Sequence, residues 1–478
     1  MLFNSIDFAL FLPIVFALYW VIGSERLKIQ NILLLVASYY FYGCWDWRFL
    51  GLIIFSSFID YSIGNALSKT ENLNERKLLL FLSLFVNLGF LGFFKYYNFF
   101  LDSFTTVFTF FGQSFEPSRL NIILPVGISF YTFQTLSYTI DVYRKKLEPS
   151  KDIISFFAFV SFFPQLVAGP IERATKLLPQ FYEKRSFKQN LAIDGMRQIL
   201  WGLFKKMVIA DSCAEYVNSM FQWYEYQSAS TLLVAAILFA FQIYCDFSGY
   251  SDIAIGTSRL FGFKLMKNFN FPYFSRDIGE FWRRWHISLS TWFRDYLYIP
   301  LGGSRGGNGM RVRNTFIIFI VSGFWHGANW TFLFWGFLNA LYFIPLLLLG
   351  KNRSNLDTVA AGRIFPSMKE IIQIMSTFLL TVFAWIFFRA ESITKALLYI
   401  GKLFDSSIFS IPKDFKLSLL LLIMFFMIIE WLQREKEHGL ENLESKMSKS
   451  TRWIFYVFLI FLIYIFEGEQ ANFIYFQF

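Results

Sequence analysis

The sequence predicts an all-α polytopic membrane protein, and two observations carry this prediction. Of its 478 residues, 55% are hydrophobic and only 16% are charged, so the chain holds more apolar surface than a soluble fold of this length could bury. Its apolar residues also form continuous runs, whereas the strands of a membrane β-barrel alternate apolar and polar residues. Because no polar stretch is long enough for a soluble domain, we expect one membrane domain over residues 1–478.

The apolar runs predict roughly ten to twelve crossings, with re-entrant and interfacial helices between them. They lie near residues 6–22, 30–43, 49–66, 78–94, 122–140, 196–212, 229–245, 313–349, 371–388, 416–432 and 453–466. The first run has neither a basic start nor a small-residue cleavage site, so we expect a retained helix rather than a signal peptide.

The net charge of +10 could indicate a nucleic-acid partner, but the basic residues stand in short loops beside apolar runs. Loops such as Arg144–Lys146 and Arg305–Arg313 are typical of cytoplasmic loops held against anionic lipid, so we expect membrane lipids and no nucleic acid as partners. The segment Arg434–Arg452 is basic while both chain ends lack Lys and Arg, which predicts that both termini are extracytoplasmic. The three cysteines are far apart without metal-ligand spacing, so no disulfide framework or metal site is expected.

Two segments break the helical pattern. Residues 268–310 become rich in Arg, Trp, Tyr and Gly, and residues 161–181 are interrupted by Pro and Gly at short intervals. Irregular backbone at membrane depth persists only where protein or a water-filled cavity satisfies its amides, so both segments are expected to re-enter the membrane or to lie along its surface. A loop packed on the membrane surface is the alternative for each.

His326 lies inside the stretch Thr315–Gly350, which contains no charged residue. That stretch is too long for one straight crossing of a hydrocarbon core about 30 Å thick, which predicts a break between Ser322 and Asn329. A proton-binding group at such depth usually faces a cavity or polar partners. A functional histidine and a structural, hydrogen-bonded one both fit this position.

His286 lies in the segment FWRRWHISLS, residues 281–290, next to Arg283 and Arg284. Helical spacing would align its ring with Trp282 and Leu289 on one face, and a surface helix covered by its own aromatic residues is the structural alternative. The two guanidinium groups could attract a phosphate-bearing donor or anionic lipid headgroups.

Six segments together resemble the membrane-bound O-acyltransferase (MBOAT) family, in particular its bacterial alginate and peptidoglycan O-acetyltransferase branch. They are MLFNSIDFALFLPI at the start, LPVGISFYTFQTLSYTIDVYR (124–144), FFPQLVAGPIER (162–173), YCDFSGYSDIAIG (244–256), FWRRWHISLSTWFRDYLYIPLGG (281–303) and FWHGANWTFLFWG (324–336). The similarity covers nearly the whole chain, and the order of the segments makes a chance match improbable.

The resemblance implies a central funnel open to the cytoplasm that meets an outer cavity near the active-site histidine. It places that histidine at His326 and the second polar position at His286, so residues 268–349 are expected to hold the active-site motifs. It further implies a bacterial cytoplasmic membrane protein without a bound cofactor that uses acetyl-CoA or another acyl thioester. A separate extracytoplasmic acyltransferase of the SGNH type is the expected partner, and an acyl carrier protein is a second candidate.

On this interpretation His326 is the general base that deprotonates an attacking hydroxyl. Trp325, Asn329 and Trp330 are candidate lining groups, with packing as the alternative role for the tryptophans, and His286, Arg283 and Arg284 would guide the donor inward. The aromatic tail, residues 467–478, is expected outside the membrane. Its Tyr475 resembles the terminal tyrosine of a small peptide that partners relatives in teichoic-acid D-alanylation and could carry the acyl group, although an interfacial aromatic anchor is the alternative.

Three other functions fit parts of the sequence. A transporter would also have many helices, broken segments and a buried histidine, but the inverted repeats that would favour it are absent from the sequence. Acylation of a lipid or peptide would require a side opening to lipid and a long acyl pocket. Transfer of D-alanyl from a carrier protein keeps the family and changes the cargo, and the basic loop near Arg305–Arg313 suits a carrier protein and coenzyme A equally. The final polysaccharide acceptor is left open.

Overall fold

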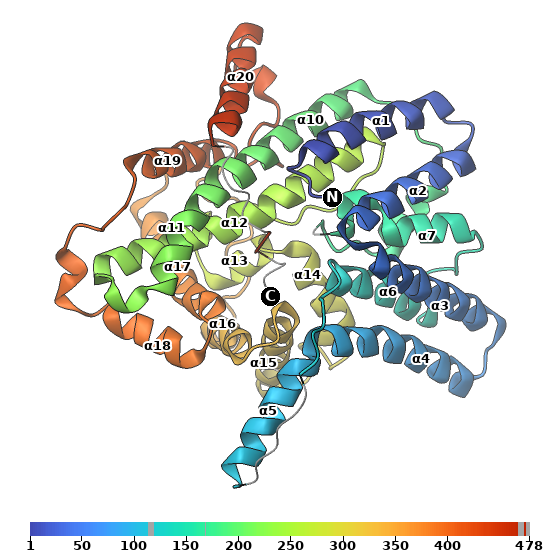
Figure 1. Cartoon of the computed structure of the whole chain (residues 1–478), viewed down its shortest axis with the longest axis horizontal. Helices are drawn as coiled ribbons and strands as arrows, with labels where there is room; N and C mark the ends of the chain where they lie inside the picture. Colours follow the sequence, from blue (N-terminus) through green and yellow to red (C-terminus); the bar gives the residue numbers. More distant parts are fainter. Residues whose placement is uncertain (113–118, 168, 467–472, 475–478) are drawn as a thin grey trace. The chain divides into compact units, whose positions relative to one another are not determined.

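The computed structural model describes residues 1–112, 119–167, 169–466 and 473–474, and the described residues form helices and loops without a strand (Figure 1). The contacts divide the chain into two compact units: residues 1–192 with 257–265, and residues 193–256 with 266–478. The division follows no single linker, because helix α12 (Ala229–Leu260) begins in the second unit and ends in the first.

The first unit is built from six long helices and three short ones. They are α1 (Ile6–Ile22), α2 (Leu27–Asp46), α3 (Leu50–Lys69), α4 (Leu73–Leu91), α5 (Tyr97–Phe110), α6 (Ile128–Tyr143), α7 (Ile153–Ser161), α8 (Phe163–Leu166) and α9 (Ala174–Leu177). Its interior holds a carboxylate, Asp60 of α3, which accepts hydrogen bonds from Ser83 at 2.5 Å and from Asn87 at 2.9 Å. Buried polar groups therefore join α3 and α4 where side chains lack water.

The second unit carries the predicted active-site motifs. Its helices are α10 (Gln189–Leu203), the π-helical turn η4 (Phe204–Ala210), α11 (Asp211–Gln222), most of α12, α13 (Ile278–Arg284), α14 (Ile287–Phe293), α15 (Gly307–His326), α16 (Trp330–Leu348), α17 (Met368–Arg389), α18 (Ile393–Lys402), α19 (Leu417–Leu432) and α20 (Lys449–Ile465). In α17, apolar side chains such as Ile372 are exposed while Thr377 and Thr381 are buried. This inverted distribution is what a helix bundle dissolved in lipid requires.

Among the residues that the structure describes, five helical stretches are long and apolar enough to cross a membrane: Leu27–Lys69, Leu73–Phe110, Ala229–Leu260, Trp330–Leu348 and Met368–Arg389. Three shorter apolar helices, Ile6–Ile22, Ile153–Leu166 and Leu417–Leu432, accompany them. The chain is therefore an all-α, multi-pass membrane protein, as the sequence predicts. The sequence prediction missed α5, α7 and α18, and the apolar run near residues 122–140 becomes helical only at Ile128.

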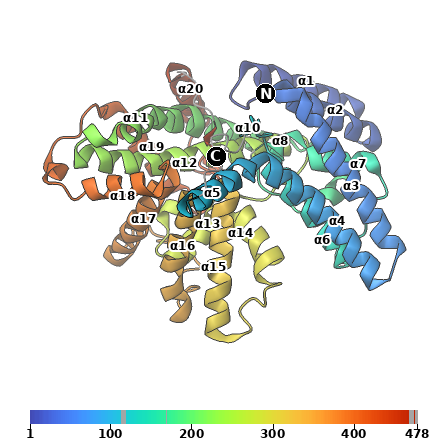
Figure 2. The same cartoon turned by 60° about the horizontal axis from the view of Figure 1, so that its bottom comes forward.

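The predicted break in the charge-free stretch is confirmed. Helix α15 ends at His326, Gly327 is extended, and α16 begins after Asn329, whose side chain accepts a hydrogen bond from the amide of Thr331 at 3.0 Å. The two helices run side by side in both views (Figures 1 and 2), and Arg311 near the start of α15 donates to Leu347 O near the end of α16 at 3.1 Å. They are thus an antiparallel pair.

Two glycines set the spacing of this pair. A Cβ atom on Gly323 would collide with the carbonyl of Phe332, and one on Gly336 would collide with the carbonyl of Phe319. Small residues allow helix backbones to approach closely where lipid supplies no hydrophobic drive between helices. The close approach fixes where α15 ends and therefore where His326 lies.

We predict that Gly323→Ala lowers the free energy of unfolding by about 1–3 kcal/mol, because the added methyl group meets backbone rather than a movable side chain. Gly309→Ala is the matched control on the same helix, since nothing lies within 4 Å of a Cβ there. The measurement is thermal unfolding of both variants in the same detergent. Equal transition temperatures would show that the helices do not depend on this contact.

Candidate active site

His326 occupies the last position of α15 and is 3% exposed. Aromatic rings enclose it: Trp335 lies perpendicular to the imidazole at 5.3 Å between ring centroids, Phe388 lies at 5.4 Å, and Trp325 lies at 5.0 Å. These walls come from α15, α16 and α17. They exclude bulk water and leave the imidazole at the point where the helical backbone is interrupted.

His286 lies 6.2 Å from His326 between ring centroids, although the two residues are 40 positions apart in the chain. The expectation that residues 281–290 form one helix is wrong: α13 ends at Arg284, His286 has a φ of 43°, and α14 starts at Ile287. A left-handed conformation is unfavourable for a residue with a Cβ and is held in place by its surroundings. The turn separates the imidazole from the helical face on which Trp282 and Leu289 were expected to accompany it.

Asn268 fixes the orientation and the tautomer of His286. Its Nδ2 donates to Ser251 Oγ at 3.1 Å, so its Oδ1 is the acceptor that faces His286 Nδ1 at 3.1 Å and receives the Ser288 hydroxyl at 2.9 Å. The hydrogen-bond network therefore assigns the proton to Nδ1 and leaves Nε2 as the basic nitrogen. The sequence analysis did not single out Asn268, which lies between Lys267 and Phe269 at the start of the irregular segment 268–310.

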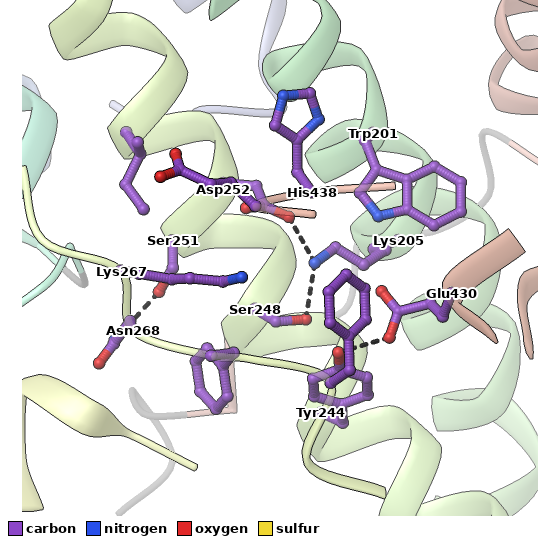
Figure 3. Close-up of a pocket in the computed structure, with 14 residues that line it drawn as sticks. Trp201, Lys205, Tyr244, Ser248, Ser251, Asp252, Lys267, Asn268, Glu430 and His438 are labelled. Atoms are coloured by element: carbon purple, nitrogen blue, oxygen red, sulfur yellow. Dashed lines mark hydrogen bonds and ion pairs between the residues drawn. The ribbon is translucent and has the colours of Figure 1, made fainter. Parts of the chain in front are cut away.

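Behind Asn268 lies a small polar pocket (Figure 3). Its lining includes Trp201, Lys205, Tyr244, Ser248, Ser251, Asp252, Lys267, Asn268, Glu430 and His438. The volume is about 20 Å³, which is room for about one water molecule. Lys205 pairs with Asp252 at 2.5 Å, and burial lowers the pKa of Lys267 to about 8. The charges at this site are therefore mutually compensated rather than arranged around a large ligand.

Arg283 and Arg284 are turned toward the chain itself. Arg283 donates to the carbonyls of Asn352 and Asn355, each at 2.7 Å, and Arg284 pairs with Glu280 at 2.8 Å. Arg276 extends the network to Asp357 at 2.9 Å, and this hydrogen bond lowers the pKa of the Asp357 carboxyl. The guanidinium groups thus hold the loop that follows α16 against α13.

The three predicted lining residues, Trp325, Asn329 and Trp330, differ in their positions relative to the two histidines. Trp325 is 3% exposed and contacts both imidazoles, with its ring 5.9 Å from His286. Asn329 caps α16 and donates to the carbonyl of Glu391 at 3.0 Å. Trp330 is 58% exposed and does not join the histidine pair. Of the three, Trp325 is the residue that walls the site.

The described part of the C-terminal tail lies in the interior of the second unit. Phe473 and Ile474 are 2% and 1% exposed, and the Phe473 ring packs 4.7 Å from Tyr250. The amide of Ile474 donates to Asp246 Oδ2 at 2.7 Å, while Asp246 Oδ1 pairs with Lys206 at 2.8 Å. These two residues are therefore docked in the protein rather than placed at a membrane surface. Tyr475 lies outside the described residues.

Phe247 connects the tail to the site. Its ring lies 4.6 Å from His286 on one side and 6.1 Å from Phe473 on the other. One aromatic side chain of α12 thus separates the docked tail from the histidine pair. The sequence pattern does not predict that the tail lies near the histidines, because Phe247 and Phe473 are far apart in the chain and meet only in the folded structure.

Comparisons with known proteins identify the family of the chain. Residues 147–388, which contain both histidines, match the membrane-bound O-acyltransferase family. The chain is 42% identical over 402 residues to a probable alginate O-acetylase AlgI of Pseudomonas aeruginosa, covering 83% of this chain and 73% of that protein. It is 36% identical over 427 residues to a peptidoglycan O-acetyltransferase of Helicobacter pylori, covering 83% and 78%.

A more distant relative is a teichoic acid D-alanyltransferase of Bacillus subtilis, 28% identical over 232 residues, which covers 46% of this chain and 58% of that protein. The shared feature of these proteins is acyl transfer, and the site described above supplies imidazoles buried in a membrane helix bundle. The chain belongs to the membrane-bound O-acyltransferase family and is a membrane O-acyltransferase.

Proposed function

We propose that the protein moves an acetyl group from a cytoplasmic thioester such as acetyl-CoA across the bacterial cytoplasmic membrane for O-acetylation of a cell-surface polysaccharide. The names of two relatives support this, since one is a probable alginate O-acetylase and the other a peptidoglycan O-acetyltransferase. Alginate, peptidoglycan and related exopolysaccharides are the candidate acceptors. A transporter, or an enzyme acting on lipid or peptide, has no comparable support.

The observation that carries the proposal is the pair of imidazoles 6.2 Å apart inside an aromatic enclosure. His326 takes the proton of an attacking hydroxyl, the hydroxyl oxygen bonds to the thioester carbonyl carbon, and the carbon–sulfur bond breaks. The thiolate then leaves with the proton that His326 returns. His286, with its basic Nε2 set by Asn268, orients the reacting groups.

The proposed direction of transfer follows from charge. The start of α15, the end of α16 and the loop beyond carry Arg305, Arg311, Arg313, Lys351 and Arg353, which supports a cytoplasmic position for this end. The donor enters there, and the loop held by Arg283 and Arg284 forms part of its entrance. Both termini are extracytoplasmic on this topology.

Tyr475 is the proposed first acceptor. Its two predecessors are docked by Asp246 and by the aromatic rings of α12, which supports a tail held beside the histidines rather than an interfacial anchor. A phenol needs a base to act as a nucleophile, and His326 supplies it. The acyl group then passes to a separate extracytoplasmic acyltransferase of the SGNH type, which completes transfer to the sugar.

Transfer of D-alanyl from an acyl carrier protein is the second candidate, favoured by the similarity to the teichoic acid D-alanyltransferase. The identity is lower and the aligned region shorter than for the O-acetyltransferases. Direct comparison of acetyl-CoA and a D-alanyl-loaded carrier protein as donors separates the two.

We predict that His326→Ala lowers label transfer from radiolabelled acetyl-CoA to the purified protein by about 10²–10⁴-fold, because it removes the general base. Ser322→Ala, one turn earlier on the same helix, is the control and keeps wild-type transfer. Tyr475→Phe abolishes the covalent label. Undiminished labelling of His326→Ala at normal protein levels would disprove its role as the base, and label retained on Tyr475→Phe would assign the acceptor elsewhere.

We predict that Asn268→Ala lowers transfer by about 10- to 100-fold, the usual cost of losing a residue that orients a functional histidine. Asn270→Ala, two positions away and without contact to His286, serves as the control. Asn268→Asp restores an acceptor but adds negative charge, which stabilises the imidazolium and raises the pKa of His286. The pH profile of Asn268→Asp therefore shifts its rising limb to higher pH. An unshifted profile would contradict the assignment.

We predict that Asp246→Ala releases the tail while Asp211→Ala does not. Both variants remove one carboxylate from Lys206, but only Asp246 accepts the amide of Ile474. Hydrogen bonds to a charged group contribute about 1.5–3 kcal/mol, so the amide of Ile474 should exchange about tenfold faster or more. Hydrogen–deuterium exchange of the C-terminal peptide measures this, and equal exchange in both variants would refute docking by Asp246.

A further inference from the structure

A second, larger pocket lies in the second unit, away from the histidines. It has a volume of about 210 Å³ and is formed where the ends of α11 and α17 meet α18, with Asn218, Phe221, Gln222, Arg389, Glu391 and Tyr399 among its lining residues. A single water requires on the order of 10–15 Å³ by the same measure, so this space takes a small molecule or one unit of a polymer rather than a structural water.

The charge in this pocket is carried by Arg389. Its Nη2 donates to Asn218 Oδ1 at 2.9 Å, and its guanidinium carbon lies 5.6 Å from the centre of the Phe221 ring. Within the described ranges the guanidinium makes no other hydrogen bond and has no carboxylate within 4.0 Å. The nearby Glu391 is already paired with Lys395 at 2.5 Å. A planar cation with donors left over beside an open space is suited to a carboxylate.

The remaining walls suit a sugar. Phe221 and Tyr399 close one wall of the pocket, since their rings stack on each other at 4.6 Å and Tyr399 is 2% exposed. Asn218 and Gln222, four residues apart on α11, supply amide groups that can pair with hydroxyls. An acidic peptide would use the guanidinium but would gain less from the two amides than a sugar with several hydroxyl groups.

The pocket opens at the acceptor end of the site. The backbone carbonyl of Glu391, at the rim of the pocket, accepts a hydrogen bond from the side-chain amide of Asn329. Asn329 belongs to the turn directly after His326. The basic loops lie at the opposite ends of α15, α16 and α17. The pocket is thus on the proposed outer side.

We propose that this pocket binds a carboxylate-bearing sugar unit, a uronate, of the acceptor polysaccharide. Arg389 binds the carboxylate, the amides of α11 bind hydroxyls, and the stacked pair of Phe221 and Tyr399 closes the wall beside the sugar. This inference rests on the proposed function, because it assumes a polysaccharide acceptor. Binding of the sugar can nevertheless be measured without catalysis.

The test is isothermal titration of the protein in lipid nanodiscs with a short oligouronate, and with the same oligomer after reduction of its carboxylates to alcohols. Wild type should bind the oligouronate at least about tenfold more tightly than the reduced form. Arg389→Gln should remove this preference, and Arg389→Lys should retain part of it, because lysine keeps the charge but loses the bidentate geometry. Lys416→Gln, which removes a surface cation paired with Glu215, is the control and binds as wild type.

Equal binding of the two oligomers, or unchanged binding by folded Arg389→Gln, would overturn the proposal. An oligoglutamate that competes as well as the oligouronate would show that the pocket recognises acidic peptide instead of sugar. Label transfer from acetyl-CoA is measured on the same samples. Transfer without oligouronate binding rejects the pocket alone, whereas binding without transfer rejects the proposed donor chemistry and keeps the pocket.

Discussion

The structure depends on a requirement that lipid imposes: every backbone amide has to find a partner within the protein. Continuous helices meet this requirement, and an interruption persists only where the surrounding structure satisfies the exposed groups. The interruption after His326 does so with Asn329, whose side chain caps α16 and also binds the carbonyl of Glu391. The close contact through Gly323 and Gly336 holds the two helix ends together. The site exists because this break is supported.

Buried charge is the second organising element of the unit that holds the candidate site. The π-helical turn η4 places the adjacent residues Lys205 and Lys206 in the interior, each against carboxylates of its own. Lys205 belongs to the small polar pocket behind Asn268, and Lys206 to the dock of the C-terminal tail. Turns of this kind often occur at functional positions. Here one irregular turn serves two parts of the same site.

The sequence predicts more of the fold than of the site. Composition and run length predict the membrane helices, and the excess length of the charge-free stretch predicts the break near His326, because both depend on distances along one segment. The pairing of His286 with His326 depends on a left-handed turn that no periodicity reveals. Arg283 looked like a free cation because the carbonyls of Asn352 and Asn355 meet it only in three dimensions, whereas the partner of Arg284, Glu280, stands four residues earlier on the same helix and was open to sequence reasoning.

The dock of the tail uses the main-chain amide of Ile474 rather than its side chain. A hydrogen bond from the main chain does not depend on the side chain. Isoleucine could therefore be exchanged for another residue of similar size without loss of the hydrogen bond to Asp246. Proline is the exception, since it has no amide hydrogen to donate. Related tails can therefore differ in the residue at this position while binding at the same place. Sequence comparison alone would underestimate how strongly the structure constrains the position.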